Sequence, residues 1–268
     1  MRLVIASVDY KYAKSAISIT ERISKTYKWI PSNPEGFGVW FDEINEPFLK
    51  MVLKEQKESI FKNYRSLFEN SASVDDVPDF YVKSPLQRTI QLLKRHRDIY
   101  YYRNKAISEY RPASIIITSL AAKVAKNTPA LSLEELLPHI VNGIADYAIL
   151  LQGKVPEAKV AGEERNFIYK QESKWYIPNP VDPADNYADS WSDEIAKAFF
   201  DWTEAVKRDL SETSCLNEMR YMAGLQTSFG KNYVDSKLGI KEQKSPCLQP
   251  RKITQTSKPS QIFLLQEN

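Results

Sequence analysis

Apolar residues recur at three- and four-residue spacing over most of the chain, which is typical of amphipathic helices with one buried face. Asn33 and Pro34 stand before the first such run. An asparagine N-cap followed by proline at the first helical position predicts that a helix begins there. The spacing predicts helices over 35–69, 85–103, 112–127, 132–152, 188–210 and 215–229. Helices therefore dominate the predicted fold.

Other parts of the chain depart from the helical pattern. The segments RLVIASV (2–8) and SAISIT (15–20) are short, apolar and β-branched, which predicts two strands at the edge of a sheet. The aromatic segment 28–41 and the proline-containing segment 166–186 predict structured loop or extended chain. Beyond about residue 241 apolar residues are sparse, and the composition predicts a mobile tail. The predicted fold class is α+β and mostly helical.

Composition narrows the class of protein further. Hydrophobic residues make up 43% of the chain and charged residues 26%, as in ordinary globular proteins. The formal net charge of +3 is too small to predict a nucleic-acid partner from bulk electrostatics. Cys215 and Cys247 form no Cys-x-x-C motif, and no apolar run approaches the ~20 residues of a membrane span. We therefore expect a cytoplasmic protein without a membrane segment.

The stretch SPLQRTIQLLKRHRDIYY (84–101) raises the question of candidate chemistry. Its apolar helical period leads directly into Lys94, Arg95, His96 and Arg97. On a helix, Lys94 and Arg97 share a ridge because they are three residues apart. From the residues alone, this basic cluster is either the solvated end of a helix or a binding site for a polyanion.

Three segments, in this order and spacing, resemble the second half of the bacterial cGAS/DncV-like nucleotidyltransferases, which make cyclic oligonucleotides and also resemble animal oligoadenylate synthases. They are WIPSNPEGFGVWF (29–41), SPLQRTIQLLKRHRDIYY with RPASIIITSLAA (84–122), and IPNPVDPADNYADSW (177–191). The resemblance covers about residues 1–230. In that family a mixed sheet carries the catalytic carboxylates and a C-terminal helical bundle closes the nucleotide cleft.

The resemblance implies a division of the chain into three parts. Residues 1–83 would be a remnant of the nucleotidyltransferase core, with strands and then a helix. Residues 84–240 would be the C-terminal helical bundle of the synthase, and 241–268 the mobile tail.

The resemblance also gives roles to Lys94 and Ser114 at the triphosphate of the donor nucleotide. Lys94 matches a lysine that reaches the phosphates, and Ser114 matches a serine at a helix start, where first-turn amides lack intrahelical partners. From the residues alone, Lys94 is better interpreted as a snorkelling lysine, whereas Ser114 could equally be a serine that satisfies its own backbone. Arg97, with Arg95 and Arg111, could add charge to the same cleft, although such arginines are more often exposed or ion-paired.

Several other conspicuous residues have a structural interpretation. His96 is interpreted as a satisfied structural histidine, since His139 is too distant in sequence to make a metal site with it. Asp182 and Asn186 favour tight turns before a helix that starts within 187–191; contact with a ribose or base is the alternative. The tryptophans interpreted as core anchors are Trp29, Trp40, Trp191 and Trp202.

Catalytic carboxylates are conspicuously missing from the sequence. Nucleotidyl transfer needs two metal ions held by carboxylates, and the resemblance implies Mg²⁺. The family supplies these ligands from a Gly-Ser loop, an Asp-x-Asp strand and a third Asp on a later strand. None of the eight glycines is followed by serine, and no apolar strand contains Asp-x-Asp. Val4 stands where the third Asp belongs and cannot hold Mg²⁺, which leaves Asp9 as the nearest carboxylate.

The sequence thus predicts a member of the cyclic-oligonucleotide synthase family that binds nucleoside triphosphates but is inactive alone. The family's products are second messengers in antiphage defence. A start in mid-sheet favours a truncated frame, whereas Val4 favours a degenerate protein. The alternatives are a non-catalytic nucleotide-binding partner of an intact homologue or upstream fragment, and a helical interaction module.

Overall fold

The structure, a computed structural model, describes residues 12–23, 26–64, 73–154, 167–213 and 218–238. Its helices are α1 (Pro34–Asn63), α2 (Pro85–Arg103), α3 (Ser114–Ala125), α4 (Leu133–Ala145), α5 (Asp193–Thr213), α6 (Glu218–Phe229) and α7 (Lys231–Leu238). Its strands are β1 (Ile17–Ile23), β2 (Thr26–Ser32), β3 (Tyr169–Gln171), β4 (Lys174–Tyr176), β5 (Pro178–Asn179) and β6 (Asp182–Asn186). The strands form three separate two-stranded antiparallel sheets. The predicted fold class, α+β and mostly helical, is confirmed.

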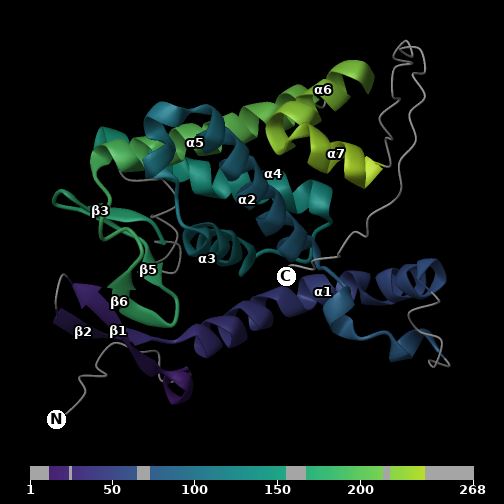
Figure 1. Ribbon diagram of the computed structural model, residues 1–268, viewed down its shortest axis with the longest axis horizontal. Helices are drawn as coiled ribbons and strands as arrows, with labels where there is room; N and C mark the ends of the chain where they lie inside the picture. The colour runs from purple at the N-terminus through teal and green to yellow at the C-terminus, as the bar shows by residue number, and fades with distance from the viewer. Residues whose placement is uncertain (1–11, 24–25, 65–72, 155–166, 214–217, 239–268) are drawn as a thin grey trace, which may run out of the picture.

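The long helix α1 runs along one side of the molecule, with the β1–β2 ribbon beside its N-terminal end (Figure 1). Helices α2 to α7 form a bundle that lies next to α1, and the short strands β3–β6 lie at one end of this bundle. Within the described residues, no helix is both long enough and apolar enough to cross a bilayer.

Local capping explains why the helix starts were predictable. The Asn33 side chain accepts a hydrogen bond from the Gly36 amide at 2.9 Å, with Pro34 following as the first residue of α1. A Cβ on Gly36 would lie 2.4–2.7 Å from Asn33 side-chain atoms, so this cap requires a glycine. Helix α2 has the predicted bounds, and a capping box between Ser84 and Gln87 starts it.

The strand predictions were partly wrong. Strand β1 overlaps the predicted strand at 15–20, but its partner is β2, which lies where the sequence predicted a loop; Ile19 is opposite Ile30. Successive side chains of β2 point to opposite faces of the ribbon, as in any strand. Pro31 is tolerated because each strand of a two-stranded ribbon has a free edge. The other predicted strand, 2–8, and the predicted tail from 241 onward lie outside the described residues.

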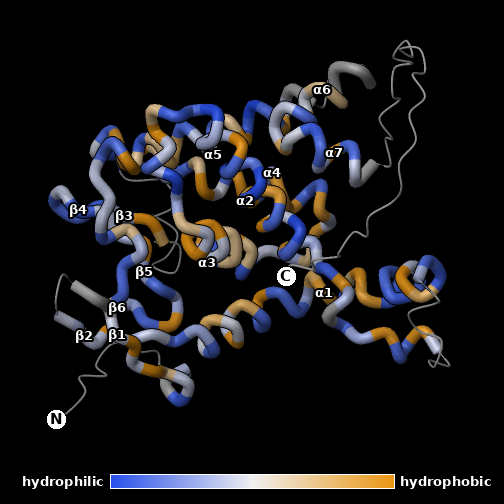
Figure 2. Tube along the Cα trace, in the orientation of Figure 1, coloured by the Kyte–Doolittle hydropathy of each residue, from blue (hydrophilic) through white to orange (hydrophobic). Residues whose placement is uncertain are grey.

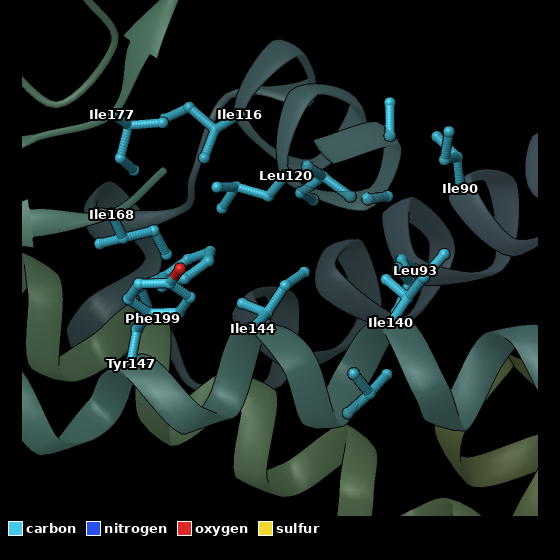
Figure 3. Close-up of a cluster of buried hydrophobic side chains, with 14 of the residues drawn as sticks. Ile90, Leu93, Ile116, Leu120, Ile140, Ile144, Tyr147, Ile168, Ile177 and Phe199 are labelled. Carbon is cyan, nitrogen blue, oxygen red and sulfur yellow. The ribbon is translucent and has the colours of Figure 1, made fainter. Parts of the chain in front are cut away.

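The hydrophobic core lies among α2, α3, α4 and α5. Helix α3 is coloured as mostly hydrophobic along its length (Figure 2), and most of its residues are buried. Figure 3 shows side chains from the facing helices pointing toward one another across this core. The labelled residues are Ile90, Leu93, Ile116, Leu120, Ile140, Ile144, Tyr147, Ile168, Ile177 and Phe199, all of them buried.

Asn186 organises the segment between β4 and α5. Its Oδ1 accepts hydrogen bonds from the amides of Ile177 at 2.8 Å and Ala188 at 3.0 Å. Its Nδ2 donates to the carbonyl oxygen of Trp175 at 2.9 Å. These contacts support the turn interpretation of Asn186. The helix predicted to start within 187–191 begins later, at Asp193.

The tryptophans did not all behave as predicted. Trp40, Trp191 and Trp202 are buried core residues, as expected. Trp29 is 66% exposed, so its interpretation as a core anchor was wrong. It lies on β2, whose ribbon also leaves Ile17 and Tyr27 exposed. A two-stranded ribbon cannot bury large side chains by itself, which explains the error.

The Asn186 contacts predict a stability effect. Replacing Asn186 with alanine leaves one carbonyl and two amide groups without their partner, so Asn186→Ala should lower the free energy of unfolding by about 2 kcal/mol. Urea unfolding followed by circular dichroism measures this change. Asn127→Ala, at an exposed position, is the control and should change stability by less than about 0.5 kcal/mol. Equal stability of the two variants would contradict the role of Asn186.

Candidate functional site

The buried Arg97 guanidinium joins the C-terminal half of α2 to the start of α3. Arg97 is only 6% exposed. Its Nη1 donates to the Pro112 carbonyl oxygen at 2.9 Å and to Ser114 Oγ at 3.1 Å. Its Nε and Nη2 donate to Asp98 Oδ1 at 3.0 and 2.8 Å. Arg97 therefore has its donors committed within the fold, and it positions Ser114 at the N-terminus of α3.

Lys94 lies one helical turn before Arg97 on the same ridge of α2. Its side chain is partly buried, and burial lowers its pKa, with a further contribution from the charge of Arg97. Within the described part of the chain, its ammonium makes no hydrogen bond or ion pair. A half-buried cation without a partner is stabilised by any anion that binds beside it.

Ser114 is the first residue of α3 and is exposed. Its hydroxyl oxygen accepts from Arg97, so its own proton remains available to a ligand. The N-cap residue Ala113 provides no side-chain acceptor for the first-turn amides. These amides and the helix dipole make the start of α3 suitable for a negatively charged oxygen. Lys94 and Ser114 are thus brought to the same region, with Arg97 as the link between their helices.

The charge around this site is positive. Asp98 is the acidic partner of Arg97, and it also lies 3.6 Å from Nη1 of Arg111, whose side chain is 56% exposed. One carboxylate is therefore shared by two guanidinium groups, while Lys94 has no acidic partner among the described residues. The remaining positive charge favours an anionic ligand, such as the phosphates of a nucleotide.

His96 has the structural role that the sequence suggested. The indole Nε1 of Trp202 donates to His96 Nδ1 at 3.1 Å, and His96 Nε2 lies 3.1 Å from Asp209 Oδ2. Because an indole N–H can only donate, His96 Nδ1 must be the acceptor and Nε2 carries the proton toward Asp209. Ser228 also donates to this carboxylate, at 2.7 Å. The buried ring thus links α2 to α5 and is not available to a ligand.

Sequence reasoning missed the partly buried Lys123 on α3. Its Nζ donates to the carbonyl oxygen of Pro178 at 2.5 Å, which fastens β5 to α3. Burial lowers the pKa of Lys123 to about 8. The available signal was that Lys123 is the one charged residue of α3. Its partner, 55 residues away in the sequence, could not be inferred from that signal.

No metal site is found in the described parts of the chain. These residues contain no group of three or more histidine, cysteine or acidic side chains that could hold an ion. The positions singled out for a third carboxylate, Val4 and Asp9, lie outside them. The described residues therefore offer no ligand set for the Mg²⁺ that the resemblance implies, and Mg²⁺ binding stays a prediction.

Comparison with known proteins identifies what this chain is similar to. No family model matches it. It is 29% identical over 190 residues to a protein named c-di-GMP synthase from Roseivirga ehrenbergii, an alignment that covers 70% of this chain and 40% of the relative. The structure of the Bradyrhizobium diazoefficiens CD-NTase CdnG in complex with GTP matches with a TM-score of 0.54 at 20% identity. That match covers 84% of this chain and 59% of CdnG.

The fold therefore resembles that of part of the CD-NTase CdnG. The two matches together confirm the resemblance to the bacterial cGAS/DncV-like nucleotidyltransferases that was drawn from the three sequence segments. The chain spans about two fifths of the length of the curated relative that it matches.

The burial of Lys123 predicts a specific pH dependence. The native state releases the Lys123 proton near pH 8, whereas the unfolded chain holds it until the ordinary lysine value of 10.5. Below about pH 8, Lys123 is charged in both the native and the unfolded state, and the native state is destabilised by the burial of this charge. We therefore compare the free energy of unfolding of the wild type with that of Lys123→Met. The difference, wild type minus variant, should stay constant below about pH 8 and increase as the pH rises from about 8 to 10.5.

Urea unfolding at pH values below, within and above this window measures the difference. Lys126→Met, at an exposed position just after α3, controls for the loss of a lysine from this region. A difference that does not change with pH would show that Lys123 is not desolvated in the native state.

Proposed function

We propose that this chain is the nucleotide-binding helical part of a cyclic-oligonucleotide synthase, which joins nucleoside triphosphates into a second messenger for antiphage defence. The observation that carries the proposal is the partly buried Lys94, which lacks a partner in the described residues and shares a ridge with the residue that holds Ser114. Lys94 is a compact charge on a long stem, suited to phosphate oxygens. Ser114 and the first-turn amides of α3 supply neutral donors to the same phosphate chain.

The relatives suggest which nucleotides to test. One is named a c-di-GMP synthase, and the other was solved in complex with GTP. Both proteins are longer than the region that matches this chain, and their guanine nucleotides support the choice of ligand. Guanine nucleotides are the first choice of ligand, and ATP is the comparison.

Catalysis by this polypeptide alone is not part of the proposal. Mg²⁺ would neutralise the phosphates of a bound triphosphate, but the described residues offer no carboxylate cluster to hold it. Gly-Ser and Asp-x-Asp are also absent from the sequence. The role of Lys94, Ser114 and the α3 N-terminus is to bind and orient the triphosphate. The carboxylates would have to come from an upstream fragment or an intact homologue.

A non-catalytic nucleotide-binding partner of such a homologue is the second candidate. The exposed apolar residues of the β1–β2 ribbon favour it, because they offer contact area to another polypeptide. Mixing the chain with an intact homologue and measuring the homologue's rate of synthesis tests this candidate. An unchanged rate of synthesis at a saturating concentration of this chain would exclude a regulatory role toward that homologue.

Calorimetric titration with GTP and with ATP, in the presence of Mg²⁺, tests the proposed function. Lys94→Ala should raise the dissociation constant about tenfold, since it removes a charged donor to phosphate. Lys54→Ala, on the exposed side of α1, controls for the loss of one positive charge. Equal affinities of the wild type and Lys94→Ala would show that Lys94 does not contact phosphate.

A second prediction concerns turnover. Chromatography of reactions with GTP, ATP and Mg²⁺ should detect no oligonucleotide product from this chain alone. The reason is that the sequence lacks the Gly-Ser and Asp-x-Asp motifs whose carboxylates would bind the metal ions. A homologous full-length synthase is the positive control. Release of pyrophosphate with a new dinucleotide, from protein free of other synthases, would refute inactivity.

A further inference from the structure

A groove lies beside the C-terminal half of α2 and the 3₁₀ segment Lys105–Tyr110. Its volume is about 660 Å³, and none of the site residues Lys94, Arg97 and Ser114 lines it. The residues that line it include Arg95, Asp98, Ile99, Tyr102, Ser108 and Arg111. This volume is in the range of small-molecule sites.

The groove adjoins the Lys94 site but offers other charged and aromatic residues. Arg95, Ile99 and Tyr102 follow one another at spacings of four and three residues, so they share one face of α2. Lys94 precedes Arg95 directly and is rotated by about 100° around the helix; its own face continues through Asp98 and Tyr101, which also line the groove. Asp98 borders both regions, since it binds Arg97 and lies near Arg111.

Arg95 is held rigidly at one side of the groove. Its Nε donates to the carbonyl oxygen of Phe229 at 2.8 Å, and its guanidinium carbon lies 5.5 Å from the centroid of the Tyr233 ring. Gly230 makes this possible, because a Cβ there would lie 2.7 Å from Arg95 Nη2 and the residue has a φ of +86°. The acceptor is an uncharged carbonyl, so Arg95 keeps its full positive charge. Among the described residues, its terminal nitrogens donate no hydrogen bond.

The charge within the groove is not balanced. Asp98 is the one carboxylate among its lining residues, and it is already bound by Arg97 from the core side. Arg111 lies 3.6 Å from this shared carboxylate and is mostly exposed. Arg95 and Arg111 together therefore leave net positive charge on the groove.

Tyr102 gives the groove an aromatic surface. Its side chain is 75% exposed, and it makes no ring contact within the described residues. A nucleotide base can stack on such a ring while its phosphate pairs with a nearby guanidinium. An acidic peptide would satisfy the arginines but would not require an open aromatic face. We propose that this groove is a second nucleotide site, in which Arg95 and Arg111 bind phosphate and Tyr102 stacks on the base.

The test uses the full chain carrying Lys94→Ala, so that the site of the proposed function is weakened first. Calorimetric titrations use two probes without metal, GTP and a single-stranded tetranucleotide, because both present a base next to a phosphate. Adding Tyr102→Ala should weaken binding about tenfold, as expected for the loss of one stacked base. Adding Tyr102→Trp should preserve it, and Arg111→Gln should weaken it about as much as Tyr102→Ala. Tyr64→Ala, at another exposed tyrosine, is the control and should change nothing.

The outcomes separate this inference from the proposed function. If Lys94→Ala alone leaves the affinity for GTP unchanged, the proposed function fails, whereas a loss on Tyr102→Ala still supports the groove. Tighter binding of the tetranucleotide than of GTP would identify an oligonucleotide as the ligand, and the reverse order a free nucleotide. Unchanged affinities for both probes in Tyr102→Ala and Arg111→Gln would overturn the inference.

Discussion

A guanidinium group buried between two helices must be paired, and the arrangement around Arg97 follows from this requirement. Its donors reach Asp98 on its own helix and the Pro112 carbonyl and Ser114 hydroxyl at the start of α3. Removing these partners would leave an uncompensated charge in the interior, so the junction between α2 and α3 has little freedom. Arg97 therefore fixes where the N-terminus of α3 lies and which way Ser114 faces.

This constraint also distributes charge on the two faces of α2. Asp98 is occupied by Arg97, so it cannot fully neutralise Arg111. Lys94 on one side and Arg95 with Arg111 on the other remain available to anions outside the fold. Because Asp98 is shared by two arginines, positive potential remains beside this part of α2, although the net charge of the chain is only +3.

Local sequence signals predicted much of the fold, because caps and helical periodicity act over a few residues. The Asn33 cap and the Ser84 capping box are examples. Features that depend on distant partners were not predictable. The Arg97 clamp needs the Pro112 carbonyl, Lys123 needs Pro178, and the exposure of Trp29 depends on whether anything covers the ribbon. Lys94 and Ser114 were singled out by resemblance, whereas the residues alone favoured a snorkelling role for Lys94.

The exposure of Trp29 has a practical consequence for spectroscopy. The sequence holds five tryptophans, and the other four, Trp40, Trp175, Trp191 and Trp202, are buried. A water-soluble quencher such as iodide will reach the indole of Trp29 and leave the remaining emission largely intact. The quenchable fraction of the tryptophan fluorescence therefore reports on the β1–β2 ribbon, and its protection on mixing with another polypeptide would locate the contact without any label.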